Sequence, residues 1–217
     1  DELVADEWKV GGFRTSTIAK TMQAGVNYRI RFEYFQEGGG AAARFTWKRK
    51  NETRDLFIEH LNKADMIVAC FGHSSDSEAE GGDRSFFLPE ADSQLIARIA
   101  KCKKPIIGVV NAGGNIGMQS WEPSLKGLLW SWYAGQEGGR AVADVLFGKV
   151  NPSGKLPMTF EKKWEDNPAY NSYHDPDGDK HVKYTEGIFI GYRGYDKLGR
   201  EVQYPFGYGL SYTSFKL

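Results

Sequence analysis

Four carboxylates fall within the twelve-residue stretch SSDSEAEGGDRS, residues 74–85, and they are Asp76, Glu78, Glu80 and Asp83. Crowded carboxylates repel one another, which favours the protonated form of at least one of them. A carboxylic acid that stays protonated near neutral pH can act as a general acid. Two other interpretations stay open, namely a solvated acidic loop without chemistry and a cation site, because oxygen ligands in calcium loops also occupy alternate positions.

The elements that must position this acidic loop form an α/β pattern. The preceding stretch MIVACFG, residues 66–72, is a continuous apolar run, which predicts a strand covered on both faces. Further strands are predicted at 105–114 and 125–135, and helices at 56–65, 88–104 and 136–148. This order predicts a mostly parallel sheet. In such sheets ligands bind beyond the carboxyl ends of the strands, which is where the acidic loop lies.

The residues on either side of this pattern predict β-structure. The stretches VNYRIRFEYFQ, residues 26–36, and ARFTWKRK, residues 43–50, alternate between apolar and polar side chains and are joined by a glycine-rich turn. After residue 151 the chain becomes rich in turns, and EGIFIGYRGYD, residues 186–196, reads as a short extended piece. Residues 208–217 alternate again, which predicts the first strand of a further β-domain.

Composition excludes several classes of protein. The formal net charge is zero, which argues against a nucleic-acid-binding protein and against attachment to anionic membranes. No apolar run approaches the roughly 18 residues of a membrane span. Cys70 and Cys102 fit no metal or redox spacing and are interpreted as small buried side chains. We therefore predict neither a metal nor another cofactor.

Other candidate residues have simpler structural interpretations. His73 could contact a substrate, but a structural histidine with satisfied hydrogen bonds is the favoured interpretation. The glycine-rich NAGGN, residues 111–115, lacks the lysine and helix start of a phosphate-binding loop and predicts a tight turn. Four aromatic residues could stack on sugar rings, although their strand-like spacing favours a core position for most of them: Trp121, Trp130, Trp132 and Tyr133.

Several long stretches, taken together, resemble the C-terminal half of family 3 glycoside hydrolases of the β-glucosidase type. They are EAEGGDR, LPEADSQLI, NAGGN, WYAGQEGGRAVADVLFGKVNPSGKLPMTF, YTEGIFIGYRGYD and YPFGYGLSYTSF, in that order from residue 78 to residue 215. Residues 1–50 resemble the end of a PA14 domain, which some members carry inserted in their α/β domain. The resemblance implies a PA14-like part at 1–50, an α/β sandwich domain at 51–207 and the start of a fibronectin-III-like domain at 208–217.

The resemblance also implies roles for residues of the acidic loop. The general acid/base of the family is the glutamate directly before glycine in motifs of the kind E-G-x-D-R, which here is Glu80, with Glu78 as the second candidate. Asp83, Arg84 and His73 are implied to support the loop or bind substrate. The nucleophilic aspartate of these retaining enzymes lies on a (β/α)8 barrel that these residues do not include. We therefore expect an internal fragment of an exo-acting β-glucosidase that is inactive alone.

The implied partners are a β-glucoside or oligosaccharide with a terminal glucosyl or xylosyl residue, and the barrel of the same enzyme. A homo-oligomer stays open. The resemblance favours a periplasmic or secreted enzyme whose signal peptide lies upstream, and a cytoplasmic location also stays open. The alternative function is a non-catalytic glycan-binding module. A pure binding module has no use for a protonated glutamate, so the acidic loop separates the two hypotheses.

Overall fold

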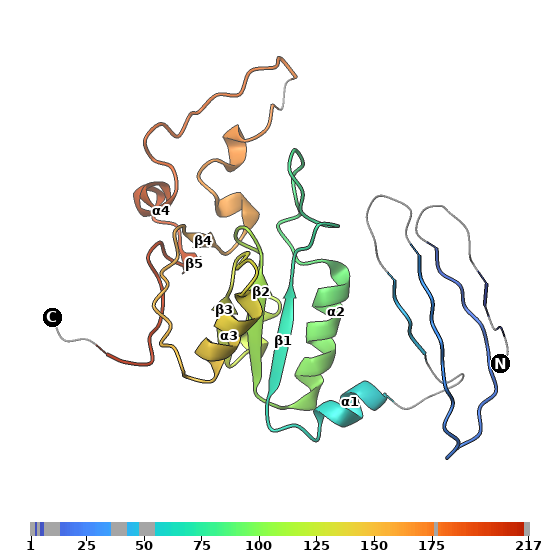
Figure 1. The fold of residues 1–217 in the computed structure, drawn as a ribbon. Coiled ribbons are helices and arrows are strands. Elements are labelled where there is room, and N and C mark those ends of the chain that lie inside the picture. Colours follow the sequence, from blue (N-terminus) through green and yellow to red (C-terminus); the bar gives the residue numbers. More distant parts are fainter. Residues whose placement is uncertain are drawn as a thin grey trace. The chain divides into compact units, whose positions relative to one another are not determined.

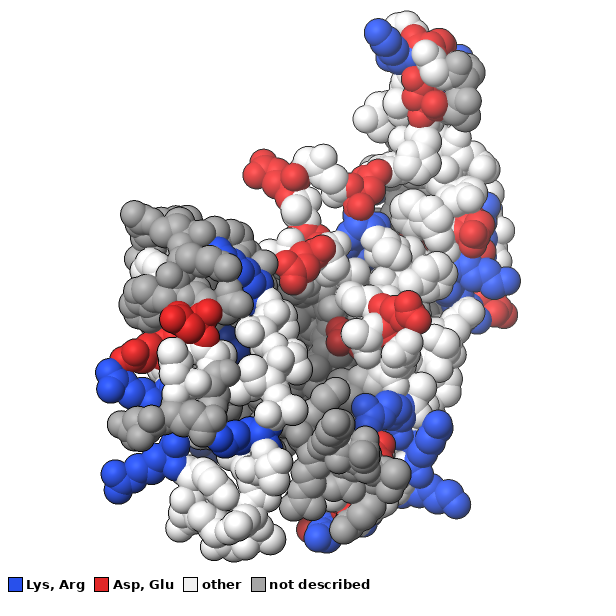
Figure 2. Space-filling view, turned by 90° about the vertical axis from the view of Figure 1, so that its right-hand side faces the viewer, with Lys and Arg blue, Asp and Glu red and all other residues white. Residues whose placement is uncertain are grey.

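The computed structural model describes residues 3, 5–6, 14–35, 43–47, 55–175 and 178–214 (Figure 1). The chain divides into two compact units, Asp1–Arg54 and Asp55–Leu217. On the face visible in Figure 2, acidic and basic side chains are interspersed, consistent with a formal net charge of zero.

In the first unit, the described residues 14–35 and 43–47 run as extended chain with one turn at residues 24–25 (Figure 1). No helix or strand is assigned within these described stretches, so the two predicted strands are not seen as a hydrogen-bonded ladder there. The predicted face alternation does bring Phe32 and Phe45 together, with ring centroids 6.0 Å apart. The turn predicted at 37–42 lies outside the described residues.

The second unit contains a parallel sheet of three strands, β1 (Ile67–Gly72), β2 (Ile106–Asn111) and β3 (Gly127–Trp130). They pair in the order β1-β2-β3, and both pairings are parallel. This confirms the predicted α/β class with a parallel sheet. Gly72 pairs with Asn111, so the carboxyl ends of β1 and β2 lie side by side. A second, antiparallel sheet joins β4 (Phe160–Glu161) to β5 (Val202–Tyr204).

Three helices correspond to predicted ones: α1 (Leu56–Leu61), α2 (Glu90–Ile99) and α3 (Gly138–Leu146). The Asp55 carboxylate accepts a hydrogen bond from the Ile58 amide at 3.2 Å, which satisfies a free donor of the first turn of α1. Pro89 directly precedes α2, and the helix continues into a 3₁₀ turn at Ala100–Cys102. Further 3₁₀ turns lie at Glu122–Ser124, Trp164–Asp166 and Tyr170–Ser172.

The fourth helix, α4 (Tyr192–Leu198), corrects the prediction of an extended piece at 186–196. Gly191 at φ +54° turns the chain just before the helix, and Gly199 at φ +59° ends it in the left-handed conformation usual for helix C-termini. Glycine at both ends therefore outweighed the strand-like composition between them. The strand predicted at 208–217 is not assigned in its described part, residues 208–214, and β5 lies upstream of it.

The core lies between the sheet, α2 and the β4–β5 pair. Its fully buried side chains are Phe160, Ile96, Ile99, Ile106, Ile116, Met118 and Val110. Trp121 packs edge-on against Phe71, with ring centroids 5.2 Å apart.

The prediction that the strand at 66–72 is covered on both faces, with Cys70 buried, was wrong. Along β1 the side chains of Ile67, Ala69 and Phe71 are buried, while Val68 is half exposed and Cys70 is exposed. The face of β1 that carries Val68 and Cys70 is therefore not covered by the described residues. Cys102, by contrast, is buried as predicted.

Candidate active site at the carboxyl ends of the strands

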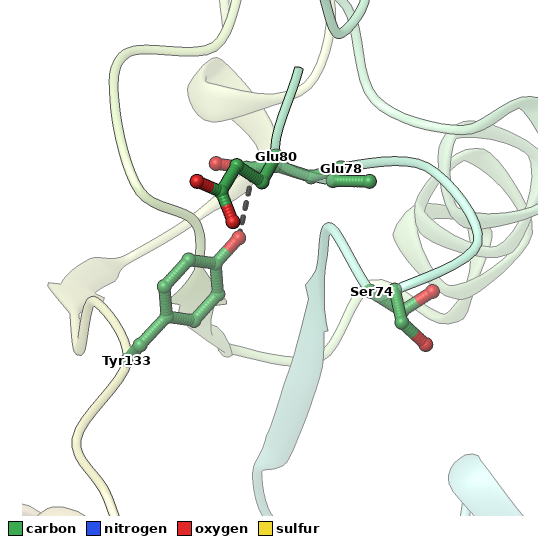
Figure 3. A pocket seen from close by; sticks show the side chains of 6 residues that line it. Ser74, Glu78, Glu80 and Tyr133 are labelled. Carbon is green, nitrogen blue, oxygen red and sulfur yellow. Dashed lines mark hydrogen bonds between the residues drawn. The ribbon is translucent and has the colours of Figure 1, made fainter. Parts of the chain in front are cut away.

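The acidic loop is one of three segments that meet beyond the carboxyl ends of the parallel strands. It follows β1, the turn Ala112–Gly114 follows β2, and Tyr133 follows β3. A cavity of about 390 Å³ opens here, lined by Ser74, Ser75, Glu78, Ala79, Glu80 and Tyr133 (Figure 3). The position agrees with the general rule that parallel sheets bind ligands at this edge.

Glu78 is held in place by two neighbours. Its Oε2 atom accepts a hydrogen bond from the Tyr133 hydroxyl at 2.6 Å, and the Arg84 guanidinium Nε lies 3.5 Å from the same oxygen. The Glu78 and Arg84 side chains are only 24% and 19% exposed. Limited exposure reduces screening of this ion pair by solvent. Glu78 therefore links the acidic loop to the segment that follows β3.

Glu80, two residues further along, has different surroundings. Its side chain is exposed and lines the cavity (Figure 3). Among the described residues, no hydrogen bond or ion pair reaches its carboxylate. A carboxylate in this position can take up or give away a proton at a bound molecule without first breaking an internal contact.

Two glycines after β2 provide the space that Glu78 and Arg84 occupy. A Cβ atom on Gly113 would lie 2.6 Å from Glu78 Oε1 and 3.1 Å from the Tyr133 ring. A Cβ atom on Gly114 would lie 2.8 Å from the Arg84 Nη2 atom. The tight turn predicted for NAGGN is therefore also the surface on which the acidic loop rests.

Arg84 is bonded to this turn as well. Its Nη2 donates to the Asn115 carbonyl oxygen at 2.7 Å, and its Nη1 donates to the Ser85 carbonyl oxygen at 3.1 Å. The Asn115 side-chain amide in turn donates to the Glu161 carbonyl oxygen of β4 at 3.1 Å. Arg84 thus joins the acidic loop to the turn after β2, and Asn115 joins that turn to β4.

Replacing Arg84 by methionine is expected to lower the free energy of unfolding of the 217-residue chain by about 2 kcal/mol, because charge-assisted hydrogen bonds and a partly buried ion pair are lost together. Urea unfolding measures this. The control is Arg98→Met, which removes an exposed ion pair with Asp55 at 2.9 Å and is expected to change stability by less than about 1 kcal/mol. Equal losses in both variants would contradict a supporting role for Arg84.

Asp83 and His73 lie beside the cavity rather than in its lining. The Asp83 carboxylate accepts a hydrogen bond from the Tyr173 hydroxyl at 2.7 Å, and this bond is the main cause that raises the pKa of Tyr173. His73 is buried, and its Nδ1 lies 3.1 Å from the Ser77 hydroxyl oxygen, which is within the acidic loop. Its Nε2 has no partner among the described residues. Burial, followed by the nearby Arg84 charge, lowers the pKa of His73 and favours the neutral ring.

Of the aromatic residues predicted to lie in the core, Trp121 is 3% exposed, and Trp130 and Trp132 pack against the core. Tyr133 is the exception, at 57% exposed. It follows Trp132, whose φ of +53° is an uncommon conformation for a bulky residue and marks a turn of the chain after β3. Strand alternation does not predict such a turn, so the contact between Tyr133 and Glu78 could not be inferred from the sequence.

The cation interpretation of the acidic loop gains no support. Within the described ranges, no three histidine, cysteine, aspartate or glutamate side chains gather closely enough to hold a metal ion. No helix in the described part of the chain is both long and apolar enough to cross a membrane.

Comparison with known protein families shows which proteins the chain is related to. The profile of the glycosyl hydrolase family 3 C-terminal domain matches residues 5–192. The chain belongs to this family. The resemblance in the sequence motifs is thereby confirmed, including the relation to β-glucosidases, since curated relatives and solved structures of that name match the chain.

Among the curated relatives of this family 3 chain is the probable beta-glucosidase I of Emericella nidulans. It is 37% identical over 99% of the chain, but the match covers 28% of that protein. The probable beta-glucosidase K of the same organism is 43% identical over 73% of the chain and 19% of its own length. The chain therefore spans about a quarter of the length of such relatives.

Solved structures agree with these relatives. The beta-glucosidase of Kluyveromyces marxianus, solved in complex with glucose, has a TM-score of 0.67 and 39% identity over 72% of this chain and 18% of its own. The Bifidobacterium adolescentis GH3 beta-glucosidase has a TM-score of 0.69 and 38% identity over 76% of this chain and 25% of its own. Both comparisons support the fold of the second unit and its place in the family.

Proposed function

We propose that this chain is the C-terminal part of a retaining, exo-acting β-glucosidase, in which Glu80 is the general acid/base. The nucleophilic aspartate lies on a (β/α)8 barrel of the same enzyme. The substrate is a β-glucoside or oligosaccharide with a terminal β-linked glucosyl residue, or a xylosyl residue as the second choice. Membership of the family and the names of the relatives support the activity.

The observation that carries the assignment of Glu80 is the contrast between two carboxylates of one loop. Both carboxylates line the cavity, but Glu80 has no hydrogen-bond or ion-pair partner among the described residues, whereas Glu78 is bonded to Tyr133 and paired with Arg84. A general acid/base must reach both the leaving-group oxygen and, later, a water molecule. Glu80 has this freedom.

The proposed reaction has two steps. In the first, the barrel aspartate attacks the anomeric carbon while the protonated Glu80 gives its proton to the glycosidic oxygen, and the aglycone leaves. In the second, the ionised Glu80 removes a proton from water, which attacks the glycosyl-enzyme and releases the sugar with retained configuration. Retaining enzymes place the two carboxyl groups about 5–5.5 Å apart, so the barrel must bring its aspartate close to Glu80.

The finer domain assignments are part of the same proposal. Residues 1–50 are the end of an inserted PA14-like domain, 51–207 the α/β sandwich domain and 208–217 the start of a fibronectin-III-like domain. Asp83 and His73 support the acidic loop through Tyr173 and Ser77. We further propose a periplasmic or secreted enzyme.

The test compares the 217-residue chain with a longer polypeptide that also carries the barrel, using an aryl β-glucoside and NMR of the released sugar. We expect turnover with initial release of the β-anomer only from the longer polypeptide. Turnover by the 217 residues alone, abolished by Glu80→Gln, would contradict the proposed division of the active site. The alternative, a glycan-binding module, predicts that Glu80→Gln leaves hydrolysis by the longer polypeptide unchanged.

A further inference from the structure

Glu78 and Glu80 are two positions apart, but only Glu78 contacts segments from other strand ends. Tyr133, after β3, donates to Glu78, and Gly113, after β2, leaves room for its second oxygen. Arg84 bonds to the Asn115 carbonyl oxygen in the same turn and pairs with Glu78. These contacts join all three segments at the carboxyl edge of the sheet through one carboxylate.

We propose that Glu78 and Tyr133 are positioning residues, which hold the acidic loop on the turn after β2 so that Glu80 is presented to the substrate. The inference rests on the proposed role of Glu80. It also assigns a separate role to Glu78, which the sequence motif alone left as the second candidate for the acid/base.

The contacts of Glu78 explain why it is unsuited to proton transfer. Its Oε2 accepts from the Tyr133 hydroxyl and faces the Arg84 guanidinium, so that atom already contacts two donors. Its Oε1 lies close to Gly113. A Cβ atom on Gly113 would be only 2.6 Å from this oxygen, so a larger residue there would force the carboxylate to move. Glu78 also lines the cavity, but proton transfer through its Oε2 would require breaking the contacts that hold the loop.

Tyr133 is suited to the role of a lasting donor. Burial raises the pKa of Tyr133, and its hydrogen bond to Glu78 raises it further, so the hydroxyl keeps its proton throughout the neutral range. Trp132, which has a positive φ, packs its own ring against Trp130 and Phe160, while Tyr133 directly after it lines the cavity. Unusual backbone of this kind is frequent where a side chain must be aimed at a site.

The test uses the barrel-bearing polypeptide with Glu78→Gln, Tyr133→Phe and the double variant. With a phenyl β-glucoside, whose poor leaving group needs the acid, we expect kcat to fall about 10- to 100-fold, the loss typical of small misplacements. We expect KM to stay within about 3-fold. The basic limb of the pH–rate profile should persist because the proposed acid/base, Glu80, is still present, and azide should not restore activity. Glu78→Gln removes the pair with Arg84 and weakens the bond from Tyr133, and Tyr133→Phe removes the donor of that same bond, so the losses in the double variant should be less than additive.

Gly113→Ala should also disturb the contact between Glu78 and Tyr133, because the added methyl group would displace the Glu78 carboxylate without removing it. We expect a similar loss of kcat. The matched control is Asp76→Asn, which removes an exposed charge from the same loop that has no hydrogen bond or ion pair with a described residue, and should change kcat less than about 2-fold. Thermal unfolding followed by circular dichroism shows whether each variant is folded.

The outcomes separate this inference from the proposed function. Azide rescue of Glu78→Ala, with loss of the basic limb, would make Glu78 the acid/base and overturn the inference. Unchanged kcat in both Tyr133→Phe and Glu78→Gln, or losses explained by unfolding alone, would overturn it as well. In each case Glu80→Ala tests the proposed function independently, since its own rescue by azide does not depend on Glu78.

Discussion

Glu80→Ala in the barrel-bearing enzyme is expected to lower kcat/KM for a phenyl β-glucoside by about 10²- to 10⁴-fold, the usual contribution of general acid–base catalysis. The leaving group then departs without a proton. A dinitrophenyl glucoside, whose leaving group needs no protonation, should still form the glycosyl-enzyme rapidly and then hydrolyse slowly. Stopped-flow measurement should therefore show a burst of dinitrophenol followed by a low steady rate.

Azide should restore the steady rate of Glu80→Ala with the dinitrophenyl substrate. An anionic nucleophile needs no general base, and the methyl side chain leaves space for it beside the anomeric carbon. The product would be β-glucosyl azide, identified by NMR. Asp76→Asn serves as the control and should show neither burst nor rescue. If Glu80→Ala hydrolyses the phenyl glucoside at the wild-type rate, the assignment of Glu80 is wrong.

Gly72→Ala is expected to lower the free energy of unfolding by at least about 3 kcal/mol, because steric overlap with backbone adds to conformational strain. Gly72 ends β1 at φ +145°, and a Cβ atom there would lie 1.9 Å from the Asn111 carbonyl oxygen. The amide of Gly72 also donates to the Asp92 carboxylate at 3.1 Å, which ties β1 to the first turn of α2. A shift at this point would therefore disturb strand, helix and acidic loop together.

Urea unfolding of the 217-residue chain measures the effect of Gly72→Ala. The control is Gly139→Ala in α3, where a Cβ atom would meet no neighbour within 4 Å and alanine is the better helix former. That variant should be neutral or slightly more stable. A loss below about 1 kcal/mol in Gly72→Ala would show that the junction between β1 and β2 adapts easily.

The sheet and the position of the acidic loop could be predicted from the sequence because both follow from local patterns. Apolar runs predict β1 and β2, and the helix between them predicts parallel pairing. Which faces of the strands are covered by other segments could not be predicted in the same way. Cys70 is exposed because no described residues cover that face of β1, and an apolar stretch of sequence does not indicate which segments pack against it.

The sequence predicts which loop forms the candidate site, but it does not predict which residues of other segments contact that loop. The motif around Glu80 singles out one glutamate by resemblance, whereas the division of roles between Glu78 and Glu80 depends on Tyr133, 55 positions away in the chain. The turn at Trp132 that places this tyrosine has no signal in composition or periodicity. Gly113 and Gly114 read as turn residues, and their second role becomes visible only when the neighbouring side chains are known.

The two cysteines have a practical consequence through their different exposure. A thiol-reactive probe would attach to Cys70 and leave the buried Cys102 unmodified in the folded chain. Cys70 lies two residues before Gly72, on the uncovered face of β1 and close to the start of the acidic loop. The natural sequence thus already contains a single labelling position, whose rate of modification would report whether another part of the enzyme covers this face.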